Sequence, residues 1–150
     1  MGLAKTISRV ELESIQSGMT QFYTPQSSHE TILVQIPPHT VEDLFVHRFQ
    51  TDQLLVVRGS FVLVILQNRQ YRYIPLSEHK PQVVTIPRGV VHGAINLSNT
   101  PCFVVNAVLR HGAVDPKDYQ PRKRPFPYDL QAAGAALKQF ESTEYSQLIG

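Results

Sequence analysis

Short runs of β-branched and aromatic residues recur along the middle of the chain, with turn-forming residues between them. These runs predict strands at residues 31–36, 45–49, 53–57, 61–66, 70–74, 82–86, 90–97 and 102–109. Glycine, proline, asparagine or serine occupies the intervening positions, and no helical periodicity separates the runs. Antiparallel strands at this spacing predict an all-β sandwich or jelly-roll barrel.

The two ends of the chain have different patterns. At the N-terminus a strand at residues 10–14 is favoured over a short helix at residues 8–19. Near the C-terminus, Asp129 and the alanine-rich stretch after it predict a helix at residues 129–140, packed outside the barrel or on a partner subunit. Residues 145–150 are expected to fray. We therefore divide the chain into an N-terminal arm or edge strand (1–30), a barrel (31–115) and a proline-rich connector with the C-terminal helix (116–150).

Length, charge and cysteine content narrow the class of protein. The chain has 150 residues and a net charge of +2, which fits one domain and gives no reason to expect a nucleic-acid partner. No apolar run approaches the length of a membrane helix and no signal-peptide pattern is present, so we expect a cytoplasmic protein without a membrane partner. Cys102, the only cysteine, lies in an apolar run and is expected to be buried rather than nucleophilic.

A tight turn leads into a strand that carries a histidine and an asparagine. Pro87 fixes its φ and Gly89 permits a positive φ, so the chain turns sharply before this strand. Because side chains alternate along a strand, His92, Ala94 and Asn96 share one face. This polar face suits a barrel that holds a polar ligand, or an outer strand with one face in water.

The pattern Pro-x-Gly-x-x-His-x-x-x-Asn resembles the second conserved motif of the cupin family. The resemblance implies a cupin barrel, a double-stranded β-helix or jelly roll, with His92 pointing into it. In metal-binding cupins the first motif has two histidines one residue apart, then an acidic residue and a glycine. The corresponding stretch here holds His47, Phe49 in place of the second histidine, Asp52 and Gly59.

A divalent metal would take His47, Asp52 and His92 as its ligands, because a catalytic metal usually has three protein ligands. In a regular strand His47 and Asp52 would point to opposite faces, since they lie an odd number of positions apart. A bulge would be needed to bring them together. We therefore expect no bound cofactor, and keep a divalent metal as the alternative.

Within the cupins, the chain resembles the dTDP-4-dehydrorhamnose 3,5-epimerases, which act without metal. The similarity extends over residues 45–116 and rests on residues 46–50, 54–59, 86–93 and 97–98. It implies that His47 is a general base that removes a proton next to a ketone. Three family features differ here: Phe45 replaces an arginine, Gln53 or Leu54 replaces a lysine, and the tyrosine acid after the last barrel strand is absent, with Tyr119 at a spacing that does not match.

Three functions remain open. The first is a binding protein for a small polar or sugar-like molecule. The second is an enzyme, either a nucleotide-sugar epimerase or isomerase with His47 as base, or a metal-dependent cupin. The third is a scaffold whose barrel is filled by its own side chains.

We also expect a homodimer, because the N-terminal strand leaves an edge that a second subunit can pair with. The expected ligand contacts are His47, Gln53, His92, Asn106 and Arg110.

Overall fold

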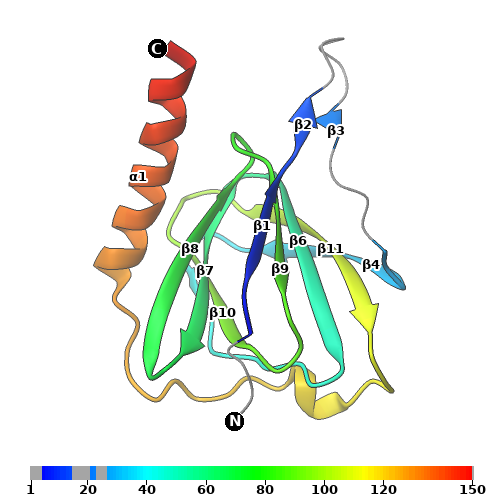
Figure 1. Cartoon of the computed structure of the whole chain (residues 1–150). Helices are drawn as coiled ribbons and strands as arrows, with labels where there is room; N and C mark the ends of the chain where they lie inside the picture. Colours follow the sequence, from blue (N-terminus) through cyan, green and yellow to red (C-terminus); the bar gives the residue numbers. More distant parts are fainter. Residues whose placement is uncertain (1–4, 15–20, 23–26, 150) are drawn as a thin grey trace.

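Two antiparallel sheets pack face to face in the computed structural model, which describes residues 5–14, 21–22 and 27–149 (Figure 1). The first sheet has five strands, in the order β1 (Ser8–Glu11), β9 (Gln82–Ile86), β6 (Gln50–Arg58), β11 (Cys102–Arg110) and β4 (Glu30–Ile36). The second has four, in the order β5 (Thr40–Val41), β10 (Val91–Asn96), β7 (Ser60–Gln67) and β8 (Gln70–Ser77). β2 (Glu13–Ser14) and β3 (Gln21–Phe22) form a separate pair. This is the all-β cupin barrel that the sequence predicts.

Alternating apolar side chains from both sheets form the core between them. Cys102 is fully buried there, as expected, and burial raises the pKa of its thiol to about 12. β7 is buried on both faces because one face meets this core while the other packs under the C-terminal helix. The core includes Ile36, Leu54, Val56, Phe61, Leu63, Ile65, Val84, Ile86 and Val104.

The expected strands are confirmed except for residues 45–49, although their ends shift by a few positions. β8 runs through Pro75, which the sequence pattern had placed in a break. β8 lies at the edge of its sheet. Proline has no N–H to donate, and on an edge strand this can leave the hydrogen bonds of the sheet intact, because one side of the strand has no neighbour. The β7–β8 turn holds Asn68 and Arg69 at positive φ, and Gly59 adopts φ +86° between β6 and β7.

The strand expected at residues 45–49 is wrong. Phe45 forms an isolated bridge to His92, and the chain then turns before β6 begins. The carbonyl of His47 accepts a hydrogen bond from the N–H of Gly89 at 2.7 Å, so this backbone is bonded to a loop rather than to a neighbouring strand. His47 therefore sits on a loop held by the turn of the second motif.

The helix α1 (Leu130–Ile149) covers the outer face of the four-stranded sheet and packs against β8 and β7 (Figure 1). The Asp129 carboxylate accepts a hydrogen bond from the N–H of Ala132 at 2.9 Å, which caps the first turn as predicted. Ala133 is fully buried against the sheet. The helix is longer than predicted, because it continues to Ile149 through most of the segment that was expected to fray.

The N-terminal strand is confirmed in part. β1 pairs with β9 at the edge of the five-stranded sheet, but it begins at Ser8, and β2 follows after a break at Leu12. A helix is absent from residues 8–14, and residues 15–20 lie outside the described part of the chain. Within the described ranges, no helix has both the length and the hydropathy needed to cross a bilayer.

Candidate active site in the barrel

The barrel contains a cavity of about 360 Å³ between the two sheets. One wall comes from β4, β6 and β11, and the other from β7 and β10. Phe45 and His47, from the segment before β6, and Tyr119, from the connector, complete the lining. A volume of this size suits a small molecule. The barrel is therefore not filled by its own side chains, which argues against the scaffold function considered from the sequence.

Both motif histidines line this cavity. His47 and the start of β10 are held together by their backbones: Phe45 N–H donates to the His92 carbonyl at 2.7 Å, and His92 N–H donates to the Phe45 carbonyl at 2.9 Å. The side chains follow, with the His47 and His92 rings 5.1 Å apart between centroids. His47 is only 9% exposed. The turn with Pro87 and Gly89 thus positions two histidines, not one.

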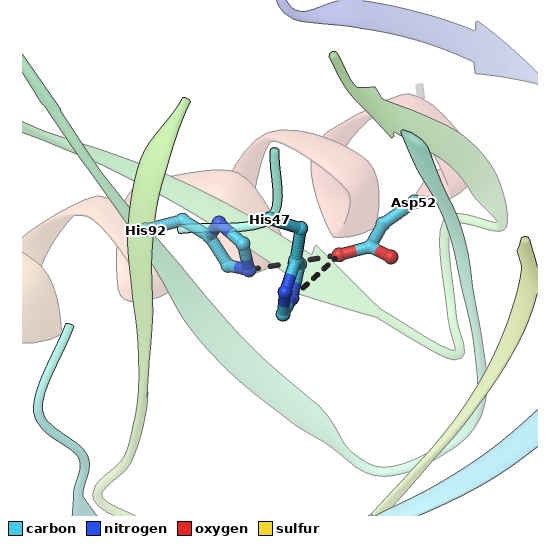
Figure 2. Close-up of side chains that lie close together, drawn as sticks. All are labelled: His47, Asp52 and His92. Carbon is cyan, nitrogen blue, oxygen red and sulfur yellow. Dashed lines mark ion pairs between the residues drawn. The ribbon is translucent and has the colours of Figure 1, made fainter. Parts of the chain in front are cut away.

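Asp52 joins the two histidines in the cavity, and Figure 2 shows both rings converging on its carboxylate. Asp52 Oδ2 lies 3.5 Å from His47 Nε2 and 3.6 Å from His92 Nε2. The expectation that His47 and Asp52 point to opposite faces is wrong, because His47 lies outside the strand to which the alternation rule applies. On the other side, Asp52 Oδ1 accepts from Asn106 Nδ2 at 3.0 Å and from the Gln50 amide at 2.5 Å.

His92 presents a fixed ring nitrogen to the cavity. Its Nδ1 lies 3.0 Å from the carbonyl oxygen of Val90. A carbonyl only accepts, so Nδ1 carries the proton and Nε2 of the neutral ring has a lone pair directed at Asp52. Burial lowers the pKa of His92; Asp52 and the hydrogen bond to Val90 oppose this, and His47 adds to it. The direction favours the neutral ring.

Tyr119 is the residue that the sequence analysis missed. It ends the short 3₁₀ helix η1 (Pro116–Tyr119), which follows the last barrel strand and is capped by Asp115. This turn carries the Tyr119 ring to within 5.4 Å of the His47 ring, between centroids. The Tyr119 hydroxyl donates to Gln50 Oε1 at 2.6 Å and accepts from Arg110 Nη1 at 2.9 Å. A phenol therefore stands beside the histidine after all.

Gln50 and Arg110 connect these groups at the rim of the cavity. Gln50 donates to Asp52 while its carbonyl oxygen accepts from Tyr119 and Arg110, so one amide links both sides of the site. Arg110 also pairs with both carboxylate oxygens of Glu30 on β4, at 3.0 and 2.8 Å. These hydrogen bonds raise the pKa of Arg110 further above its ordinary value, which keeps it cationic.

The structure brings together four of the expected ligand contacts and separates the fifth. His47, His92 and Asn106 line the cavity, and Arg110 reaches it through Tyr119 and Gln50. Gln53 lies on the other face of β6, where its amide donates to the carbonyls of Ser27 and Ala107, at 2.9 Å in each case. Adjacent strand positions face opposite ways, so Asp52 and Gln53 do not share the cavity.

The atoms of His47, Asp52 and His92 that could bind a metal lie within 4.8 Å of one another. Two imidazole nitrogens and a carboxylate oxygen are a suitable donor set for a divalent transition metal. The 3.5 and 3.6 Å separations are close to those between the ligands of a tetrahedral ion bound at about 2.1 Å. Asn106 and Gln50 orient the carboxylate from behind, as outer partners of metal ligands do. The three residues therefore fit a metal.

The fold and the cavity define a cupin barrel with a buried His, His, Asp cluster. Solved structures with the same fold include a dTDP sugar isomerase from Desulfovibrio desulfuricans G20 (17% identity, 85% of this chain, 94% of that chain, TM-score 0.66). A sugar 3,4-ketoisomerase from Thermoanaerobacterium thermosaccharolyticum in complex with TDP (11%, 92%, 99%, 0.61) and a dTDP-4-dehydrorhamnose 3,5-epimerase from Sulfolobus tokodaii (14%, 88%, 90%, 0.58) are similar too. No protein-family model and no curated sequence matches the chain. At these identities the likeness establishes the shared fold.

Proposed function

We propose that the protein is an isomerase that moves a proton between neighbouring carbon atoms of a small, sugar-like carbonyl compound. The observation that carries the proposal is the pairing of His47 with Asp52 on one side and Tyr119 on the other, within one cavity. A base and an acid in contact with the same ligand are what this chemistry requires. The dTDP sugar isomerase and the 3,4-ketoisomerase that share the fold support the same reaction class.

Each residue has a definite role in this reaction. His47 removes the proton from the carbon next to the carbonyl, and the Asp52 carboxylate, 3.5 Å from His47 Nε2, stabilises the imidazolium that forms. Tyr119 donates its hydroxyl proton to the carbonyl oxygen, which gives an enediol, and Arg110 stabilises the phenolate. Tyr119 then recovers a proton from the neighbouring hydroxyl while His47 returns its proton to the former carbonyl carbon. The carbonyl group has moved by one carbon, and no atoms are gained or lost.

The geometry favours isomerisation over epimerisation. An epimerase that inverts a carbon needs its base and its acid on opposite faces of the substrate, so the substrate must lie between them. The rings of His47 and Tyr119 lie too close together to enclose a sugar ring, since their centroids are 5.4 Å apart. Both groups therefore act from the same face, which suits proton transfer between adjacent atoms.

The test is incorporation of solvent deuterium. The purified chain is incubated in D₂O with keto sugars, both free and linked to dTDP, and deuterium at the carbon next to the carbonyl is followed by NMR. We expect incorporation by the wild type and none by His47→Asn. Tyr71→Phe is the matched control, because the Tyr71 hydroxyl bonds the Phe126 carbonyl outside the cavity. The proposal fails if wild type and His47→Asn exchange deuterium at the same rate.

A metal-dependent reaction at the same residues is the second candidate. It is favoured by the converging acceptor atoms: His92 Nε2 has a lone pair directed at Asp52 Oδ2, 3.6 Å away. His47, Asp52 and His92 would hold the ion, which would polarise a carbonyl oxygen as a Lewis acid. Elemental analysis and exchange after EDTA treatment separate the candidates. Undiminished exchange by metal-free protein supports His47 as base, whereas loss on EDTA and recovery with one divalent ion supports the metal.

The assembly and location expected from the sequence complete the proposal: a homodimer that acts in the cytoplasm. β1 and β4 are the two edges of the five-stranded sheet, and each offers backbone groups to a second copy. Light scattering at several concentrations tests the dimer. A mass of one chain at every concentration contradicts it.

A further inference from the structure

The cavity has an apolar stretch next to its cluster of histidines and Asp52, and three strands show this in the same way. On β6 the inward position after Asp52 is Leu54. On β11 Asn106 is followed inward by Val104, which lies next to Val34 and Val56 of the neighbouring strands. On β10 the position after His92 is Ala94, opposite Leu63 of β7. A ligand in this space therefore meets the histidines, Asp52 and Asn106 on one side of an apolar stretch, and Gln35, Thr40 and Glu42 line the cavity as well. The apolar stretch consists of Ile36, Leu54, Phe61, Leu63, Ala94 and Val104.

No lysine or arginine side chain lines the cavity. The chain has 14 lysines and arginines, and all of them lie in the part whose side chains the structure describes. Arg110, which contacts Tyr119, and Arg48, which follows His47 in the chain, are already engaged. Arg110 binds Glu30, Gln50 and Tyr119 with all three of its nitrogens, and Arg48 pairs with Asp115 at 2.9 Å.

The other usual partners of a phosphate are also directed elsewhere. A helix N-terminus can bind an anion, but α1 lies on the outer face of the four-stranded sheet. Carboxylates of Asp52 and Glu42 line the cavity instead. A diphosphate placed there would lose its hydration without gaining a lysine or arginine, and it would face Asp52, which is 4% exposed.

We propose that the cavity binds an uncharged carbonyl compound with an apolar end, such as a free deoxy-keto sugar, and not a nucleoside diphosphate sugar. This inference rests on the proposed isomerase and names its substrate class. The carbonyl and hydroxyl groups lie against His47, Tyr119 and Asn106, and the methyl or methylene groups lie against Leu63 and Val104. The substrate class thus differs from that named for the dTDP sugar isomerase of the same fold.

Saturation-transfer NMR tests the inference with four probes: L-rhamnulose, L-fuculose and 2-hydroxycyclohexanone as uncharged carbonyl compounds, and TDP as the anion. At probe concentrations of about 1 mM, we expect transfer to at least one uncharged probe and none to TDP. Ala94→Leu fills the space beside the apolar stretch and should abolish the transfer. Ala135→Leu, the same substitution on the exposed face of α1, should retain it. Transfer to TDP that Ala94→Leu abolishes, or no transfer to any uncharged probe, overturns the inference.

The outcomes separate the substrate class from the reaction. Binding of TDP together with deuterium exchange into a dTDP-linked sugar would overturn the substrate class and keep the isomerase. Binding of an uncharged probe without exchange into any sugar would keep the substrate class and overturn the isomerase. Thermal unfolding of Ala94→Leu checks its folding, and Val104→Phe, which fills the same space from β11, replaces it if it does not fold.

Discussion

The ring of Tyr119 lies 5.4 Å from the ring of His47, although the two residues come from opposite sides of the barrel sequence. Removing the hydroxyl with Tyr119→Phe leaves this ring contact and takes away the proton donor, together with its hydrogen bonds to Gln50 and Arg110. We predict a fall in kcat of about 10²- to 10⁴-fold, the usual contribution of a general acid, with little change in KM. Steady-state kinetics on the substrate found by deuterium exchange measure it. Equal kcat values for the variant and the wild type would remove Tyr119 from the mechanism.

Asp52→Asn separates a catalytic carboxylate from a structural one. The amide keeps the size of the side chain but loses the charge that stabilises protonated His47 at 3.5 Å. We predict a fall in kcat of about 10- to 100-fold, of the order of the energy of one partly buried charge pair. Asn106→Asp is the comparison: it places a second carboxylate beside Asp52, and we expect it to unfold more readily in urea.

The stability of metal-free protein should depend on His92 below neutral pH. Burial lowers the pKa of His92 from its ordinary value of 6.5, while Asp52 raises it and His47 lowers it further. As the pH falls through 6.5, the unfolded chain binds a proton at this position before the folded chain does. The free energy of unfolding should therefore decrease as the pH falls, by at most about 1.4 kcal/mol per pH unit from this group. Urea unfolding in EDTA at several pH values measures the slope, and His92→Gln should reduce it. An unchanged slope in the variant would contradict the prediction.

Gly93 is required for space rather than for its φ. A Cβ atom at this position would lie 2.6 Å from the hydroxyl of Tyr128 and 3.1 Å from the carbonyl oxygen of Asp43. We predict that Gly93→Ala lowers the free energy of unfolding by about 1–3 kcal/mol through overpacking. Gly134→Ala is the control, because its Cβ would meet only Leu97 at an ordinary 3.7 Å and alanine favours the helix. That variant should gain up to about 1 kcal/mol. Urea midpoints of the two variants should move in opposite directions.

The sequence was sufficient for the barrel and for one half of the site. Strand alternation and the turn at Gly89 placed His92 correctly, because both follow from local backbone preferences. Alternation failed for His47 because the segment before β6 is not a strand, and this depends on hydrogen bonds to distant loops. The same alternation could have excluded Gln53 from the expected ligand contacts, because Gln53 is adjacent to Asp52 on β6 and must face the other way.

Tyr119 was missed for a different reason. The resemblance to the epimerases implies a tyrosine acid at a fixed distance after the last barrel strand. A connector of different length can nevertheless bring a later tyrosine to the same cavity. Asp115 followed by Pro116 is a recognisable start of a helical turn, and that signal was present in the sequence. The turn alone does not specify where its last residue points. That depends on the packing of the connector against the barrel rim.

Glu30 lies on the outermost strand of the five-stranded sheet, and two interactions separate it from the Tyr119 hydroxyl: Glu30 holds Arg110 at 2.8 Å, and Arg110 donates to Tyr119 at 2.9 Å. Any molecule that pairs with this edge and draws the Glu30 carboxylate away would free the guanidinium and change the surroundings of the phenol. Binding of a partner at the β4 edge would thus be transmitted through Arg110 to the Tyr119 hydroxyl inside the barrel.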